Sequence, residues 1–115
     1  METFNFNNYI FACEYWETSQ AWGHKVTLMH PSGVELARYK VRYYNRTWEM
    51  YTYQSAMYGA LDGWHKNELD RYLNMQKSNL NIKRWGKGQK QEYIDKFESE
   101  HPEFEMLRER IHNGK

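Results

Sequence analysis

The sequence predicts a single α+β domain, in which an antiparallel sheet of three or four N-terminal strands packs against a long helix, with two short C-terminal helices beside it. Residues 9–44 alternate between two kinds of side chain at period two, which is typical of strands. From Tyr53 onward the apolar residues recur at the three- and four-residue spacing of a helix. A chain of 115 residues buries one core but not two, so residues 1–115 are expected to form one domain.

The first two strands are predicted over residues 9–17 and 22–30. One face of the first carries aromatic and apolar side chains at alternate positions, namely Tyr9, Phe11, Cys13 and Tyr15. In the second strand Trp22, Val26 and Leu28 share a face. Residues 30–33, His-Pro-Ser-Gly, then predict a hairpin, because Pro presets φ for a turn and Gly tolerates a positive φ.

The third strand is predicted over residues 34–44, and its two faces differ in kind. The face expected to be buried carries Ala37, Tyr39, Val41 and Tyr43. The face expected to be basic and solvated carries Arg38, Lys40, Arg42 and Tyr44. Residues 45–46 either turn the chain into a short fourth strand over 47–51 or belong to a longer third strand, and we favour the turn.

A long helix is predicted over residues 53–76, with Thr52 as its N-cap and with Met57 and Trp64 on its buried stripe. Gly63 lowers helix propensity and marks a point where the helix would kink or break. Residues 77–90 show no sustained period and predict a surface connector. Two short helices follow, one over 91–99 and one that begins near Pro102.

Composition narrows the class of protein. Cys13 is the single cysteine, so no disulfide within the chain is expected and a reducing compartment is predicted. No secretory signal and no apolar stretch of membrane-spanning length is apparent, which predicts a cytoplasmic protein. The aromatic share of 17% is more than a small core can hide, so some rings are expected at the surface, where they favour binding.

The chain lacks the motifs of the common hydrolases, nucleotide-binding enzymes and transferases, so we expect a protein that is not an enzyme and needs no cofactor. Asp62, His65 and Glu68 are spaced along one helix so that they could in principle face one metal ion. A solvated helix edge with local charge pairing explains the same spacing, and we favour it.

Two groups of basic residues are the candidate binding sites. The segment 77–90 holds five cations and no acid, and its candidate residues are Lys83, Arg84, Trp85 and Lys87. Cations neutralise phosphate and a ring stacks on a base, so this composition suits contact with nucleic acid. The predicted third strand supplies the second group, Arg38, Lys40 and Arg42, with Arg46 beyond them. The composition of the first group is also typical of a flexible, solvated connector. That of the second group is also typical of the solvent-exposed face of an antiparallel sheet.

Acidic residues gather near the C-terminus, where the segment 92–105 holds six of them and Glu109 follows. Such a row could imitate the phosphates of a nucleic acid or meet a basic partner. Solvation of the two short helices, and the match of acids to helix N-terminal dipoles, explains most of the row, and we favour this explanation.

Residues 39–61, YKVRYYNRTWEMYTYQSAMYGAL, resemble a pattern found in small accessory proteins of bacteriophages and prophages. The pattern is a basic-aromatic strand, then NRTWE, then a Tyr-Gln-Ser entry into a helix, and it covers about a fifth of the chain. The resemblance implies an anti-defence factor, such as an anti-CRISPR protein that binds an effector nuclease in the host bacterial cell. It carries over no functional residue.

The leading hypothesis is therefore an inhibitor that binds a CRISPR effector nuclease as its partner. Its basic residues would contact either nucleic acid, RNA or DNA such as the guide RNA, or an acidic patch of the nuclease. The alternative is a phage nucleic-acid-binding accessory protein that uses the same basic residues on phosphates and bases. A small nuclease or another enzyme is the third hypothesis, and it would need carboxylates that converge with His65 or Glu68 in a pocket.

Overall fold

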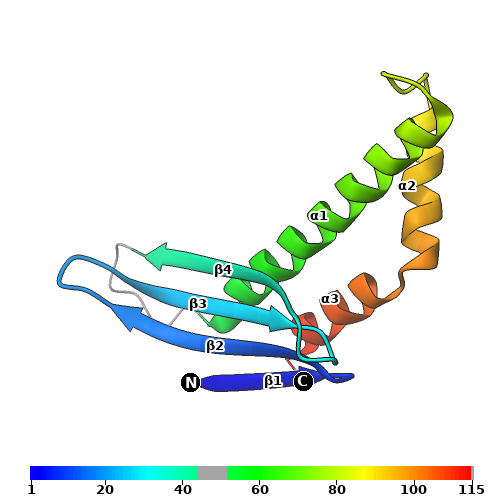
Figure 1. Ribbon diagram of the computed structural model, residues 1–115. Coiled ribbons are helices and arrows are strands. Elements are labelled where there is room, and N and C mark those ends of the chain that lie inside the picture. The colour runs from blue at the N-terminus through cyan, green and yellow to red at the C-terminus, as the bar shows by residue number, and fades with distance from the viewer. Residues whose placement is uncertain (44–51, 115) are drawn as a thin grey trace.

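The computed structural model describes residues 1–43 and 52–114, and it has the predicted α+β architecture. A four-stranded antiparallel sheet is followed by one long helix and two shorter ones (Figure 1). The strands are β1 (Glu2–Phe6), β2 (Tyr9–Glu17), β3 (Trp22–Met29) and β4 (Glu35–Tyr43). They pair in sequence order, β1-β2-β3-β4, so each strand lies beside its neighbour in the chain.

Tight turns set this order. Asn7 and Asn8 join β1 to β2 with positive φ angles of 52° and 71°, a conformation whose twist matches that of the flanking strands. The hairpin predicted at residues 30–33 joins β3 to β4, where Gly33 has a φ of 93° and His30 N–H donates to the Val34 carbonyl over 2.8 Å. The prediction missed β1. The strand predicted over 47–51 lies outside the described residues.

One face of the sheet is buried. Cross-strand pairing aligns Cys13 with Val26 and Phe11 with Leu28, and all four side chains are fully buried. The same register places Ala37, Tyr39, Val41 and Tyr43 on this face of β4, as predicted. Tyr39 is nevertheless 41% exposed, which corrects the expectation that it is buried. Its ring lies against Gly59 of the long helix, and that contact covers only one side of it.

The long helix α1 (Tyr53–Leu80) starts where predicted, because the Thr52 side chain accepts a hydrogen bond from the Gln54 N–H. Its first half lies over the sheet and buries Met57 and Trp64, as expected. It continues through Gly63 as one helix and ends at Asn81, which has a left-handed conformation. It is thus longer than the predicted 53–76, and the connector 77–90 shortens to 81–88.

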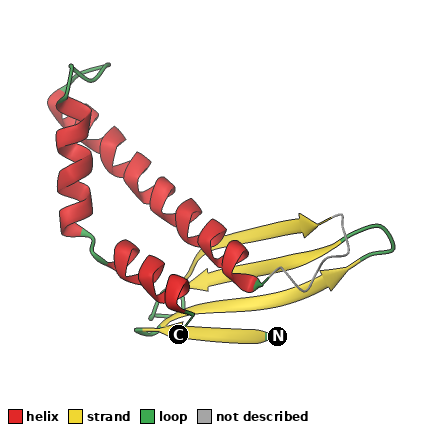
Figure 2. Ribbon diagram, turned by 180° about the vertical axis from the view of Figure 1, so that it is seen from behind, coloured by secondary structure: helices red, strands yellow, loops and turns green. Residues whose placement is uncertain are grey.

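Helices α2 (Gln89–Glu100) and α3 (Glu103–Asn113) bring the chain back along α1 (Figure 2). Helix α2 runs antiparallel to the second half of α1, beyond the sheet, and α3 packs between α1 and β1 with Phe104, Leu107 and Ile111 buried. We call the second half of α1, the connector and α2 the arm. None of the helices in the described part of the chain is both long and apolar enough to cross a membrane.

The arm makes the molecule elongated. The principal extents of the molecule are 52 × 31 × 23 Å and its radius of gyration is 17.1 Å. A compact domain of this length would have a radius of gyration of about 13 Å. The far end of the arm is therefore well separated from the sheet (Figures 1 and 2).

Candidate binding surfaces

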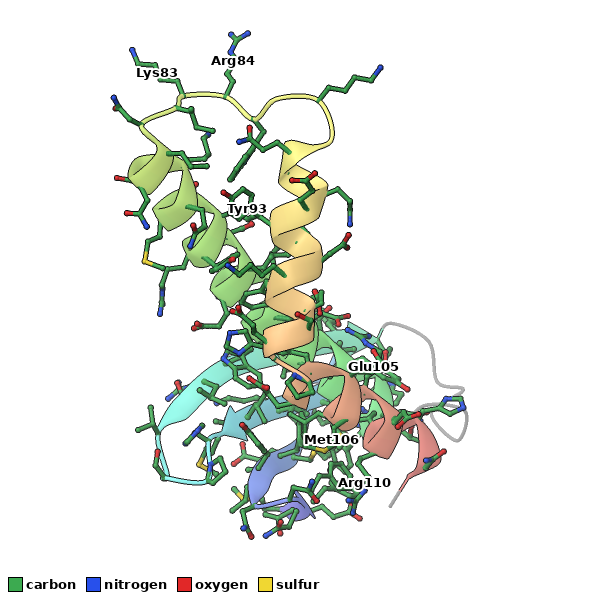
Figure 3. The ribbon with its side chains drawn as sticks, turned by 90° about the vertical axis from the view of Figure 1, so that its right-hand side faces the viewer. Lys83, Arg84, Tyr93, Glu105, Met106 and Arg110 are labelled. Carbon is green, nitrogen blue, oxygen red and sulfur yellow. The ribbon has the colours of Figure 1, made fainter. Side chains whose placement is uncertain are left out.

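The arm tip is the connector that joins α1 to α2, and it carries exposed cations. Lys83, Arg84 and Lys87 are exposed. Figure 3 shows Lys83 and Arg84 pointing away from the end of the arm. Every charged residue between positions 77 and 90 is a cation, so the tip has a strongly positive surface.

Trp85, which was selected as a candidate binding residue, packs within the arm. It is half-buried, and its ring packs against Tyr93 of α2 with a centroid distance of 5.2 Å. The turn is also held by hydrogen bonds from Ile82 N–H to the Lys77 carbonyl and from Gly86 N–H to the Gln89 side chain. Trp85 therefore helps to order the tip, beside the exposed cations Lys83, Arg84 and Lys87.

The second basic surface lies on the sheet face opposite α1, which we call the open face. Figures 1 and 2 place the first half of α1 and α3 on the other side of the sheet, and α2 beyond the sheet. Arg38, Lys40 and Arg42 are exposed there, as predicted. Arg38 is paired with Glu35 over 2.7 Å. Arg46 lies outside the described residues, so its relation to this surface stays a prediction.

A tryptophan that the sequence analysis did not select lies at the centre of this surface. Trp16 of β2 is paired with Gly23 of β3, and its ring lies so close that a Cβ at Gly23 would be 2.7 Å from it. The Lys40 ammonium lies 4.5 Å from the ring centroid and the Arg42 guanidinium 5.5 Å. These are cation–π distances, so Trp16 holds two cations of β4 above β3.

The two basic groups do not form one surface. The arm departs from the covered side of the sheet, whereas Arg38, Lys40 and Arg42 lie on the open face (Figure 1). A partner that contacts both would have to reach around the molecule. The structure therefore describes two separate candidate sites.

The three residues considered as metal ligands are each engaged with a different group. Asp62 pairs with Arg108 of α3, His65 hydrogen-bonds Glu98 of α2 over 2.6 Å, and Glu68 lies 3.4 Å from Arg71. The described residues contain no group of three or more His, Cys, Asp or Glu side chains that could hold a metal ion. Asp62 and His65 instead join α1 to α3 and α2, whereas the Glu68–Arg71 pair lies within α1.

Acidic side chains of the C-terminal segment are used within the fold as well. Glu98 contacts His65, and Glu103 lies 2.9 Å from the His101 ring. Glu105 and Glu109 line an open hollow together with Arg108, so a cation lies beside these two acids. The segment thus does not present an uninterrupted acidic row.

A cleft of about 540 Å³ lies between β1, the start of α1 and the end of α3. Its walls are mainly apolar, with Phe4, Phe6 and Met57 among them, and Glu2 and His24 supply polar atoms. His24 is buried among aromatic rings, and the centroid of its ring lies 4.4 Å from that of Tyr53. This burial lowers the pKa of His24. The neutral imidazole is therefore part of the core.

Comparisons of the chain with protein-family models, with curated proteins and with solved structures give no match.

Proposed function

We propose that the protein is a non-enzymatic binding protein whose arm brings a cationic tip to an anionic surface of a larger partner. The observation that carries the proposal is the placement of Lys83, Arg84 and Lys87 at the far end of an arm that projects from the sheet. Such an arm can enter a concave surface that a flat sheet cannot reach. Positive charge at its end favours carboxylates or phosphates there.

The packing of the tip supports this proposal. A loop pays an entropic cost when it becomes ordered on binding, and a loop held in one shape beforehand avoids most of that cost. The Trp85–Tyr93 contact and the hydrogen bonds of Ile82 and Gly86 hold this connector in the free protein. The cations are thus presented on a prepared scaffold.

The resemblance of residues 39–61 to phage accessory proteins supplies the specific form of the proposal. In that form the protein is an anti-defence inhibitor that binds a CRISPR effector nuclease in the host cytoplasm. The arm tip would contact the guide RNA or an acidic patch of the nuclease, and exposed rings such as Tyr15 and Tyr39 would add contact area.

The experiment is a charge reversal at the tip, Lys83→Glu with Arg84→Glu, tested for inhibition and direct binding against a panel of effector nucleases. Because both side chains are exposed, the melting temperature should be unchanged while inhibition is lost. The matched control is Lys66→Glu with Lys96→Glu, which makes the same charge change on exposed positions of the arm shaft. Full inhibition by the tip variant would contradict the proposed role of the tip.

A second candidate function is a phage accessory protein that binds nucleic acid directly, and the group of Trp16, Lys40 and Arg42 favours it. Binding to phosphates releases counterions, so it weakens steeply with salt. Retention of the wild-type protein on an immobilised nucleic acid, eluted by a salt gradient, would support this candidate. Passage through the column at low salt would exclude it.

A further inference from the structure

We infer that the open face of the sheet binds a single strand of nucleic acid, with its phosphates along β4 and a base on Trp16. The inference rests on the second candidate function, direct contact with nucleic acid, and adds to it the strand type, the placement of phosphates and bases on the sheet, and Lys25 as a further contact residue. It concerns a different surface from the arm tip.

The basic row on β4 matches a phosphate backbone in shape. Arg38, Lys40 and Arg42 project from alternate positions of one extended strand, so neighbouring cations are about 7 Å apart along it. This is close to the separation of successive phosphates in an extended single strand. The neighbouring strand adds Lys25, which is paired directly with Lys40.

This density of positive charge is unfavourable in the free protein. Two like charges directly opposite each other in a sheet destabilise it, as Lys25 and Lys40 do here. Glu14 stands opposite Lys25 on β2 and Glu35 is paired with Arg38, so these two acids reduce the charge only in part. A bound anion beside Lys40 would relieve the remaining repulsion.

Beside the basic row, the open face becomes less polar. The strip formed by β2 and β3 carries three half-buried side chains with large apolar parts, Ile10, Trp16 and Met29, together with the small residues Ala12 and Thr27. Its charged members are Glu14 and Lys25, which are paired with each other. A single strand has the same division into charged phosphates on one side and apolar base faces on the other. A duplex keeps its base faces inside the helix, so this combination favours the single strand.

Trp16 is positioned for stacking by Gly23. The glycine lets the indole lie across β3 towards β4, where it reaches the cations that would hold the phosphates. In the free protein Lys40 and Arg42 lie over the ring. When phosphates draw those two side chains outward, a base can take their place on the indole.

The test measures binding of a short fluorescent single strand of mixed sequence, as RNA and as DNA, and of its duplex, over a range of salt concentrations. The intact protein should bind the single strand more tightly than the duplex. Trp16→Ala should weaken binding about 5- to 150-fold, the range expected for the loss of one base–aromatic stack. Trp16→Phe keeps a ring and should retain most of the affinity.

Charge variants test the phosphate row separately. Lys40→Gln should reduce the slope of log affinity against log salt by about 0.7, the value for one phosphate contact to a single strand. Lys66→Gln, which removes a charge from the exposed surface of α1, is the matched control and should leave the slope unchanged. Thermal melts of all variants show whether each remains folded.

Each contrary outcome has a distinct meaning. If the intact protein binds no nucleic acid, both the second candidate function and this inference are wrong. If it binds but only the Lys83→Glu/Arg84→Glu variant loses affinity, the site lies on the arm and the inference alone is wrong. Equal binding of duplex with no effect of Trp16→Ala, or binding of an acidic peptide in place of nucleic acid, would also overturn the inference.

Discussion

Gly23 lies on β3 between Trp16 and Val41, where the neighbouring groups leave no room for a side chain. A Cβ at this position would be 1.8 Å from the Val41 carbonyl oxygen and 2.7 Å from the Trp16 ring. Gly63 is the opposite case, since nothing lies within 4 Å of a Cβ built there in the exposed part of α1. Glycine is therefore required for close packing at position 23, whereas at position 63 it only lowers the helix propensity of α1.

The two glycines give a matched pair of substitutions. Gly23→Ala should lower the free energy of unfolding by about 1–3 kcal/mol, because either the strand or the indole must move. Gly63→Ala should raise it by about 0.5–1 kcal/mol, because alanine is the better residue inside a helix. Urea denaturation measures both values. A Gly23→Ala variant as stable as the wild type would contradict the close packing of Trp16 on β3.

His24 gives the unfolding free energy a predictable dependence on pH. Its burial lowers its pKa in the folded state, whereas in the unfolded chain the pKa returns to about 6.5. Below that value the unfolded state binds a proton that the folded state resists, so stability falls as pH decreases towards the folded-state pKa. His24→Phe, which keeps a ring at the site, should make the stability profile flatter below about pH 6.5, the pKa of the unfolded-state imidazole.

The measurement is urea unfolding at a series of pH values, with His112→Gln as the control at an exposed histidine. The control variant should keep most of the wild-type profile. Identical profiles for His24→Phe and the wild type would show that His24 does not resist protonation in the folded protein.

At the scale of elements, the fold depends on one joint where the sheet, α1 and α3 meet. The Trp64 ring of α1 lies 5.8 Å from the Tyr9 ring of β2 and 4.4 Å from the Phe104 ring of α3. Only 7% of Trp64 is exposed, so its removal would leave a cavity that three elements share. The first half of α1 is anchored at this point, and the arm extends beyond it.

Trp64→Ala should therefore lower the free energy of unfolding by about 3–5 kcal/mol, which is a large part of the stability of a small domain. Met75→Ala, at a position that is 53% exposed on the same helix, should change it by less than about 0.5 kcal/mol. Thermal and urea unfolding provide the measurement. Near-native melting of the Trp64→Ala variant would contradict the packing at the joint.

Periodicity predicted the elements that bury a regular face. Strands β2, β3 and β4, the hairpin at residues 30–33 and the Thr52 cap of α1 are confirmed. Strand β1 was missed although Phe4 and Phe6 alternate with Thr3 and Asn5, because the segment is only five residues long and its pairing with β2 is visible only in the folded sheet. The end of α1 was missed because its last turns pack only in the arm, where few residues are buried.

For the candidate sites, composition identified the basic residues but not how the rings are used. Trp85 was selected for its neighbours in sequence, yet its partner Tyr93 lies on the next helix. Trp16 was passed over because its significance depends on Gly23, which is opposite it only in the folded sheet. The exposure of Tyr39 likewise depends on Gly59, a residue of another element. In each case the deciding neighbour lies on another strand or helix, and the pattern of residues along the chain does not identify it.

At the scale of the whole molecule, contacts between rings hold the arm at its angle to the sheet. Phe97 of α2 lies 5.4 Å from the Tyr72 ring of α1 and 5.8 Å from the Phe104 ring of α3, so it joins the three helices. Next to it, His65 and Glu98 form a polar contact between α1 and α2. The arm should therefore keep its extended position in solution, and this position separates the two basic surfaces.

Small-angle X-ray scattering can test that shape. The wild-type protein should have a radius of gyration near the 17.1 Å of the structure, well above the value of about 13 Å for a compact chain of this length. The tip variant Lys83→Glu/Arg84→Glu should keep this value, because its side chains make no contact that holds the arm. Phe97→Ala should broaden the distribution of distances, because it removes the ring that joins α2 to both other helices. A compact wild-type value would mean that the arm folds onto the sheet, and the reach assigned to its tip would then be wrong.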